Sequence, residues 1–266
     1  MIAALLLREG PAYRRNLFVK GLGILGYDAR LDWPEKADLV VTWNRYGRFD
    51  QYCKRQEEDG IPIIVVENGY FGKDTEMGMH FAMALTSHAG AGLWPRTAGP
   101  ARWRALDLHP RPLYRPAAGY PLRALVLGQR GIGQPGVASP QGWERAAAQK
   151  LRLWGVSATI RQHPGNLASQ RLSPSLEDAF KVVDFVATWG SGAAVKAMMA
   201  GKPVLYDAPK WVGSRGALPM TEESLKKLPF MEDCRELGLQ DIAAAQWSAE
   251  EVGSGQAIRS LLEIIP

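Results

Sequence analysis

The sequence predicts an α/β protein with two doubly wound domains, in which helices cover both faces of a mainly parallel sheet. Two observations predict this fold. Short apolar runs with almost no polar interruption, at 61–67 and 182–188, are typical of strands that are buried on both faces. Strand-like runs also alternate along the chain with segments of helical character, as β-α units do. A chain of 266 residues is long enough to bury two such cores.

The first half of the chain alternates strand-like and helix-like segments. Strands are expected at 2–7, 27–31, 37–43 and 61–67, and helices at 12–25 and 48–59. From 70 to 120 this pattern gives way to Gly, Pro, Arg and Trp, and five prolines between 95 and 116 indicate a linker. The predicted domains are therefore 1–115 and 116–266.

The second half continues the alternation with clearer helix signals. Strands are expected at 123–127, 156–162, 182–188 and 204–206, and helices at 141–154, 191–200, 221–228, 234–237 and 247–264. Ser191 can cap the helix that begins there, Gly201 can take the left-handed position after it, and Pro203 prevents its continuation. Ser248 and Glu251 have the spacing of a capping box at the start of the last helix.

Composition and charge define the broad class. The hydrophobic share of 46% and the charged share of 22% are those of a soluble globular protein, and a formal net charge of +5 favours anionic partners. Cys53 and Cys234 cannot make a disulfide framework or a zinc site, so a reducing compartment is expected. The N-terminus lacks a signal-peptide pattern, and no apolar segment has the length of a membrane span, so we expect a cytoplasmic protein.

Three loops that could contact a phosphate follow three of the predicted strands. They are Gln129–Gly133, His163–Gly165 and Gly190–Gly192. The carboxyl ends of parallel strands meet at one edge of a sheet, where open α/β proteins bind ligands. A helix N-terminus made of Ser and Gly is also a good site for a phosphate. Taken alone, each cluster is more simply a tight turn, and none matches a dinucleotide fingerprint or a P-loop.

His163 differs from the other histidines because it belongs to a His-Pro step at a strand end. Such a step fixes the backbone and aims the imidazole out of the sheet edge, where it can donate to a phosphate or to a leaving group. Arg161 adds a fixed positive charge nearby. The alternative is that His163-Pro164 forms only a structural turn.

These motifs together resemble the C-terminal donor domain of GT-B glycosyltransferases. The resemblance is carried by a strand followed by GQ, a strand followed by RQHP, the run WGSGAAVKAMMAGKPVLY and the closing WSAEE. Within that fold, residues 123–264 look most like the capsule and lipopolysaccharide enzymes related to the Kdo transferases. The resemblance implies two domains facing across a cleft, of which 1–115 holds the acceptor and 116–266 the donor.

The same resemblance implies a nucleotide-sugar co-substrate, expected to be a UDP-sugar, and chemistry that uses no metal ion and no cofactor. The ribose-binding carboxylate of many GT-B enzymes is missing, since the helix after the Gly-Ser-Gly loop reads AAVKAMMAG. This departure leaves the identity of the donor open. The implied donor-binding residues are Gln129, Arg130, Arg161, His163, Gly190, Ser191, Gly192 and Ala193.

An inverting transfer, which we expect here, needs a general base in the first domain. Glu67 and Glu9 are the carboxylates that follow predicted strands there, and Glu67 is the first choice because the Asn68-Gly69 turn after it would leave its side chain exposed. His163 completes the catalytic candidates as a donor to the leaving group. The alternative for Glu67 is a carboxylate that bonds only the N–H groups of its own turn.

The acceptor has to be inferred from the first domain and the linker, where arginine alternates with tryptophan and tyrosine. Such a mixture can bind a phosphate backbone and stack on bases, and an enzyme that modifies a base in a duplex must first extrude it. We therefore expect a phage-type DNA glycosyltransferase that acts on a 5-hydroxymethylpyrimidine in the host cytoplasm. The acceptor-binding candidates are Arg45, Arg48, Tyr70, Trp94 and Trp103.

Several alternatives to the DNA hypothesis stay open. The arginines and tryptophans could be ordinary surface and interface residues. The acceptor could be a capsule or lipopolysaccharide glycan, whose acidic groups would bind arginine and whose sugar rings would stack on tryptophan. The chain could also be a non-catalytic DNA-binding or sugar-nucleotide-binding protein of the same fold. An epimerase of that fold would need more acidic residues than the chain offers.

Overall fold

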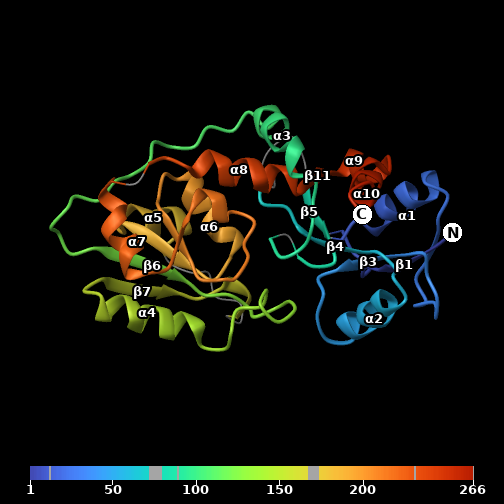
Figure 1. The fold of residues 1–266 in the computed structure, drawn as a ribbon, viewed down its shortest axis with the longest axis horizontal. Helices are drawn as coiled ribbons and strands as arrows, with labels where there is room; N and C mark the ends of the chain where they lie inside the picture. Colours follow the sequence, from blue (N-terminus) through green and yellow to red (C-terminus); the bar gives the residue numbers. More distant parts are fainter. Residues whose placement is uncertain (12, 72–79, 89, 167–173, 231, 266) are drawn as a thin grey trace. The chain divides into compact units, whose positions relative to one another are not determined.

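The computed structural model describes residues 1–266 except 12, 72–79, 89, 167–173, 231 and 266. The chain forms two compact units. The first comprises Met1–Leu106, Gly133–Pro135 and Gln240–Pro266, and the second comprises Asp107–Ile132 and Gly136–Leu239. Each unit has one sheet with helices on both of its faces (Figure 1). The predicted fold of two doubly wound α/β domains is therefore confirmed.

Within the described residues, the first unit has a six-stranded sheet. Its strands are β1 (Ile2–Leu6), β2 (Asp28–Arg30), β3 (Leu39–Trp43), β4 (Ile63–Asn68), β5 (His80–Leu85) and β11 (Gln246–Ser248). They lie in the order β11-β5-β4-β3-β1-β2, in which β1 to β4 are parallel. Strand β5 is antiparallel to β4, and β11 is antiparallel to β5.

The helices of the first unit cover both faces of this sheet. They are α1 (Arg15–Ile24), α2 (Gly47–Glu58), α3 (Gly99–Ala105), α9 (Ala249–Gly253) and α10 (Gln256–Leu262). Helix α2 lies on one face, where Tyr52 packs with Ile63 and Val65, whose side chains share a face because they are two residues apart. Helices α1, α9 and α10 lie on the other face (Figure 1), where the rings of Phe18 and Phe81 meet edge to face with centroids 5.2 Å apart.

The second unit has a five-stranded parallel sheet in its described residues. Its strands are β6 (Arg123–Leu127), β7 (Ser157–Arg161), β8 (Phe185–Thr188), β9 (Val204–Tyr206) and β10 (Leu218–Pro219). They lie in the order β10-β9-β8-β6-β7. The chain leaves β6 toward β7 on one side and later returns to β8 on the other, so the switch point of this doubly wound sheet lies between β6 and β8.

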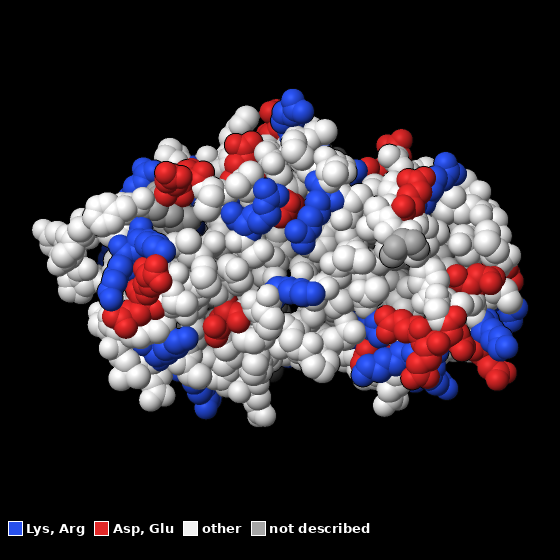
Figure 2. Space-filling model, viewed as in Figure 1, with Lys and Arg blue, Asp and Glu red and all other residues white. Residues whose placement is uncertain are grey.

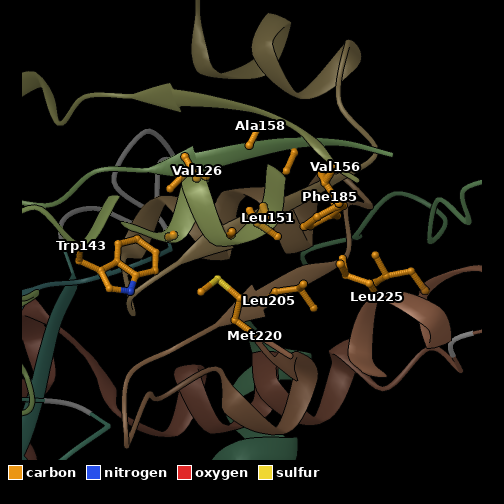
Figure 3. Packing of buried hydrophobic residues seen from close by; sticks show 14 residues of the cluster. Val126, Trp143, Leu151, Val156, Ala158, Phe185, Leu205, Met220 and Leu225 are labelled. Atoms are coloured by element: carbon orange, nitrogen blue, oxygen red, sulfur yellow. The ribbon is translucent and has the colours of Figure 1, made fainter. Parts of the chain in front are cut away.

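Helices cover both faces of the second sheet as well (Figure 1). They are α4 (Trp143–Leu153), α5 (Leu176–Lys181), α6 (Gly192–Met199) and α7 (Glu222–Lys227), while α8 (Arg235–Ala244) begins in this unit and ends in residues of the first. Helix α4 lies on one face and α5 and α6 lie on the other. Figure 3 shows the core under α4, where Trp143 and Leu151 pack with Val126 and Phe185 of the strands. Burial of each large apolar side chain of this kind contributes roughly 1.5–3 kcal/mol.

The C-terminal segment differs most from the prediction. Residues 240–266 belong to the first unit, so the expected boundary between 115 and 116 does not describe the two units. Trp247, expected at the start of a helix, lies in β11 and pairs with Phe81 of β5. The expected helix at 247–264 is divided into α9 and α10 at Gly255, whose φ is +79°. A local sequence pattern does not show that a C-terminal segment adds a strand to a sheet formed by N-terminal residues.

The stretch from 70 to 120 also contains regular structure where loop and linker were expected. It includes β5, a buried strand of sequence HFAMAL, and helix α3. Alanine, methionine and histidine are not typical strand formers, so β5 forms because it lies between β4 and β11, and its propensity alone does not predict it.

Three predicted helix-end signals in the second half are confirmed. Ser191 caps α6 by accepting a hydrogen bond from the backbone N–H of Ala193, and Gly201 has a left-handed φ of +81° after that helix. Ser248 and Glu251 form the expected capping box, although it opens the short helix α9. These ends are local, so the sequence determines them.

Candidate functional site

The three predicted phosphate loops of the second unit lie at one edge of its sheet. Leu127 of β6 pairs with Arg161 of β7 on one side and with Thr188 of β8 on the other. The loops that follow begin at Gly128, Gln162 and Trp189, immediately beyond this row of paired residues. The structure therefore brings the loops together at the carboxyl edge, on both sides of the switch point, where open α/β sheets bind ligands.

Hydrogen bonds and close packing tie the β6 loop to the β7 loop. The N–H of Gly128 donates to the carbonyl oxygen of Arg161 over 2.8 Å. A Cβ placed on Gly165 would lie 3.0 Å from Cδ of Arg130 and 3.1 Å from Nδ1 of His163. Glycine at 165 therefore makes room for Arg130 beside His163. Gln129 and Arg130 reach the same edge as His163, as the sequence predicted.

The backbone of its own loop sets the proton position on His163. Nδ1 of His163 accepts a hydrogen bond from the N–H of Gly165 over 2.9 Å. In the neutral ring the proton is then on Nε2, which makes Nε2 a donor. Partial burial, and secondarily the charge of Arg130, lower the pKa of His163. At neutral pH this side chain is therefore a neutral hydrogen-bond donor.

Arg161 lies at the end of β7 with its side chain partly buried. Its Nη1 donates to the carbonyl oxygen of Pro174 over 2.8 Å. This bond leaves the guanidinium with further N–H donors, since an arginine has five. Arg161 thus adds positive charge to the edge on which His163 lies.

The N-terminus of α6 is the third part of this edge. The N–H of Ser191 donates to Oγ1 of Thr188 over 3.0 Å, and Oγ of Ser191 accepts from the N–H of Ala193 over 3.0 Å. These two bonds fix the turn from β8 into the helix. Gly192 is exposed and Ala193 partly so, while Gly190 packs against Trp211. An exposed helix N-terminus carries a partial positive charge that favours an anion.

Tryptophans hold the loops around this edge. Nε1 of Trp189 donates to the carbonyl oxygen of Val137 over 3.0 Å, and Nε1 of Trp143 donates to Oδ2 of Asp207 over 2.8 Å. The rings of Trp143 and Trp189 meet edge to face with centroids 6.1 Å apart. The glycine-rich loop after β6 is thereby tied to the loops after β8 and β9.

The two predicted general bases lie in different surroundings in the first unit. Glu9 follows β1, its side chain is 88% exposed, and its nearest charged partner is Arg15 at 3.5 Å. Glu67, near the end of β4, is only 27% exposed, and its Oε1 lies 4.0 Å from Nε2 of His88. Glu67 is therefore held in a partly enclosed position, whereas Glu9 is a solvated surface carboxylate.

Two neighbours of Glu67, His88 and Tyr70, are uncharged at neutral pH. Burial, followed by the charge of Arg45, lowers the pKa of His88 to about 4, so the ring stays neutral. Its Nε2 accepts from the backbone N–H of Arg45 over 3.2 Å. Burial and the negative charge of Glu67 raise the pKa of Tyr70 well above its usual range, so the phenol stays protonated. His88 and Tyr70 therefore add no positive charge beside Glu67 at neutral pH.

Arg45, expected to bind the acceptor, is instead a buried ion-pair centre. Its side chain is 2% exposed, and its guanidinium bonds Asp50 over 2.9 Å, both oxygens of Glu57 and the carbonyl oxygen of Thr86. Each of these bonds satisfies a donor that would otherwise be buried and unpaired. Arg45 therefore fixes α2 against the strand ends and does not reach an acceptor.

The two tryptophans of the acceptor set are also buried. Nε1 of Trp94 donates to the carbonyl oxygen of Asp241 over 3.1 Å, and Trp103 packs on Phe71 with ring centroids 5.5 Å apart. Neither ring presents a face on which a base could stack. The acceptor-binding role expected of Arg45, Trp94 and Trp103 is thus contradicted, because packing within the first unit uses their side chains.

Arg48 and Tyr70 complete the acceptor set. Arg48 is exposed on α2, with its guanidinium 5.1 Å from the ring centroid of Trp33. Lys54 on the same helix pairs with Asp50 over 2.9 Å. On the face drawn in Figure 2, basic and acidic side chains lie side by side over α2. The surface there has mixed charge and is not a continuous basic patch.

Among the residues that the structure describes, no group of three or more His, Cys, Asp or Glu side chains could hold a metal ion. Within the same residues, no helix combines the length and the apolar character that a membrane crossing requires.

Comparison with known proteins identifies the class of fold. Neither the protein-family models nor the curated proteins give a match. The solved structure of the KpsC beta Kdo 2,7 transferase of Thermosulfurimonas dismutans matches 97% of this chain and 99% of its own, with 13% identity and a TM-score of 0.51. The KpsC beta Kdo 2,4 transferase of the same organism matches 91% of this chain and 89% of its own, with 14% identity and a TM-score of 0.47. The chain has a glycosyltransferase-like α/β fold.

The structure adds residues that the sequence patterns did not single out. Trp211 and Asp207 both lie in the loop after β9. Trp211 packs against Gly190, just before the N-terminus of α6, and Asp207 accepts a hydrogen bond from Trp143. His88 lies beside Glu67. Of these residues, Asp207 could have been found from the sequence, because it directly follows a predicted strand. Trp211 and His88 could not, because their contacts are with residues distant in sequence.

Proposed function

We propose that this protein is a glycosyltransferase that moves a sugar from a nucleotide-sugar to a hydroxyl group of a glycan. The observation that carries the proposal is the carboxyl edge of the second sheet. One row of paired residues there brings together the loop of Gln129 and Arg130, the hydrogen-bond donor His163 and the N-terminus of α6. The shared fold with a Kdo transferase supports the same reaction class.

The donor chemistry follows from the charges at this edge. A sugar nucleotide leaves as a phosphate or diphosphate, whose growing negative charge has to be stabilised. The N-terminus of α6, Arg130 and Arg161 supply positive charge, and Nε2 of His163 supplies a directed N–H. We propose that these groups bind the phosphates without a metal ion. We also propose that the nucleotide of the donor is UDP.

A glycan acceptor is favoured over DNA. The DNA hypothesis depended on arginines and tryptophans that were expected to be exposed, and Arg45, Trp94 and Trp103 are buried. A duplex also requires a run of positive charge, whereas the surface over α2 is mixed (Figure 2). The structural neighbour is a transferase of the sugar Kdo, which supports a glycan product.

Glu67 is proposed as the general base. A base has to be near its substrate and partly shielded from water, and Glu67 meets the second condition whereas the side chain of Glu9 is almost fully exposed. Neutral His88 and protonated Tyr70 lie beside it. Tyr70 can donate its phenol proton to an acceptor hydroxyl or to the carboxylate.

The proposal is tested by offering donors and acceptors separately. Thermal stability is first measured with UDP, CMP and GDP, since a nucleotide that binds the folded state raises the melting temperature. The matching nucleotide-sugars, including a nucleotide-activated Kdo, are then incubated with a Kdo-terminated oligosaccharide and with DNA containing 5-hydroxymethylpyrimidine. Mass spectrometry should find a sugar added to the oligosaccharide. Sugar added only to DNA would replace the glycan proposal, and no stabilisation by any nucleotide would contradict the donor site.

A further inference from the structure

Trp211 lies in the loop after β9, between two glycines and against Tyr206. This residue is 4% exposed. A Cβ placed on Gly190 would lie 3.1 Å from Cδ1 of Trp211, and a Cβ placed on Gly213 would lie 2.7 Å from Cη2 at the other end of the ring. Tyr206 packs against another side of the indole, and the centroids of the two rings are 5.8 Å apart. Two glycines thus leave the space that the indole occupies, and its pyrrole edge faces Gly190.

The indole N–H of Trp211 has no hydrogen-bond partner within the described structure. The other tryptophans around this edge differ, since Trp143 and Trp189 donate to Asp207 and to the carbonyl oxygen of Val137. A buried donor without an acceptor costs free energy, and native structures rarely keep one without a reason. Trp211 therefore carries a donor that lacks its acceptor.

The position of this donor points to the missing acceptor. Nε1 is bonded to Cδ1, the atom that approaches Gly190, and Gly190 directly precedes the N-cap residue Ser191. The pyrrole edge that carries the unpartnered N–H thus lies beside the turn that leads into α6, and the partial positive charge of that helix N-terminus favours an anion. A phosphate oxygen accepts hydrogen bonds from both kinds of donor at once, because each oxygen has more than one lone pair.

We infer that Trp211 is a ligand-binding residue that donates its indole N–H to a phosphate oxygen of the nucleotide-sugar bound at the N-terminus of α6. The inference rests on the proposed donor site and adds a residue to it. It also explains glycine at 190 and 213, because a side chain at either position would push the ring from its place. Binding of the phosphate satisfies the unpaired N–H of Trp211 and couples the loop after β9 to the ligand.

The test measures the affinity of UDP, CMP and inorganic pyrophosphate by calorimetry for the wild type and for Trp211→Phe, which removes the N–H and keeps an aromatic ring. A hydrogen bond to a charged group corresponds to about tenfold to hundredfold in affinity, and a loss of that size is expected. Trp247→Phe is the matched control, because Trp247 is also buried with an unpartnered Nε1 but lies in β11 of the first unit. Its affinity should equal that of the wild type.

A second measurement on the wild type does not depend on the folding of a variant. In protein with ¹⁵N-labelled indoles, the Trp211 signal should move downfield when the tightest of these ligands is added, and the Trp247 signal should not. Trp211→Phe, or Trp211→Tyr if the first variant does not fold, assigns the signal. Saturable binding with no movement of that signal, or with full affinity in Trp211→Phe, would overturn this inference alone. No saturable binding of any of the three ligands would overturn the donor site together with it.

Discussion

At the scale of single residues, the backbone prepares His163 for its proposed role. The N–H of Gly165 occupies Nδ1 and so directs the ring's proton to Nε2. Partial burial, and secondarily the charge of Arg130 beside the ring, lower the pKa of His163, which keeps the imidazole neutral at neutral pH. A neutral donor next to fixed arginine charge suits a phosphate that gains charge as the sugar leaves.

His163→Ala should abolish most of the transfer activity while leaving the fold intact. Loss of one directed donor to a developing charge typically lowers the rate by about 10²- to 10³-fold, and the ring makes few structural contacts because it is only partly buried. Transfer rate and melting temperature are measured together. His109→Ala is the control, since that side chain is 86% exposed. Full activity in His163→Ala would remove His163 from the site.

His88 should make the stability of the fold depend on pH. Its pKa is about 4 in the folded state against 6.5 in the unfolded chain, because burial disfavours the charged ring. Below pH 6.5 the unfolded chain binds a proton that the folded state refuses, so stability falls as the pH drops from 6.5 toward 4. The full loss is about 3 kcal/mol, at about 1.4 kcal/mol for each pH unit between the two values.

Urea unfolding of the wild type and of His88→Gln at pH 7 and pH 4.5 measures this contribution. Glutamine can still accept from the N–H of Arg45 but does not titrate, so the difference between the two proteins should shrink as the pH falls. His109→Gln should reproduce the wild-type pH dependence, because its ring is exposed. An equal pH slope in the wild type and in His88→Gln would contradict the prediction.

At the scale of elements, one close approach between helices holds the C-terminal segment on the first unit. A Cβ placed on Gly21 of α1 would lie 2.1 Å from the carbonyl oxygen of Val252 in α9 and 3.2 Å from the nitrogen of Gly255. Only glycine permits this distance. The contact lets α9 and α10 pack on α1 and so supports β11 at the edge of the sheet.

Gly21→Ala should destabilise the first unit, by about 2 kcal/mol or more, because the added methyl group meets backbone atoms that cannot move aside easily. Gly23→Ala on the same helix is the matched control. A Cβ at Gly23 meets nothing within 4 Å, so alanine there should stabilise the helix by about 0.5–1 kcal/mol. Both variants are compared by chemical unfolding. Equal effects of the two substitutions would show that the α1–α9 contact contributes little.

At the scale of the whole molecule, the chain makes its two units from discontinuous segments. The last residues return to complete the sheet of the first unit, where β11 covers the edge of β5. Arg102 of α3 reinforces this return by a bidentate pair with Glu251, with distances of 2.6 Å and 2.9 Å. An uncovered edge strand next to an open apolar face is prone to aggregation.

Removal of residues 245–266 should therefore destabilise the first unit and spare the second. Limited proteolysis followed by mass spectrometry should find cleavage within 1–106, while fragments from 107–239 persist. Removal of 263–266 alone, which follow α10, should leave the digestion pattern unchanged. If the truncated chain loses the second unit first, the C-terminal segment stabilises that unit instead, as the boundary between 115 and 116 implied.

The sequence by itself determined the local features of this protein. The apolar strand runs, the cap at Ser191, the left-handed Gly201 and the capping box of Ser248 and Glu251 involve only neighbouring residues, and all are found in the structure. The alternation of strands and helices determined the fold class. It also placed Gln129, His163 and Ser191 at strand ends, which parallel pairing brings to one edge.

The tertiary structure decided everything that depends on contacts between distant segments. It placed β5 and β11 in the first sheet, because their pairing partners and not their propensities make them strands. It buried Arg45 and Trp103, since a sequence does not distinguish an arginine that binds a ligand from one that is neutralised by carboxylates of its own unit. It also placed Trp211 beside Gly190, because Gly190 on one side of the ring and Gly213 on the other leave the space for it.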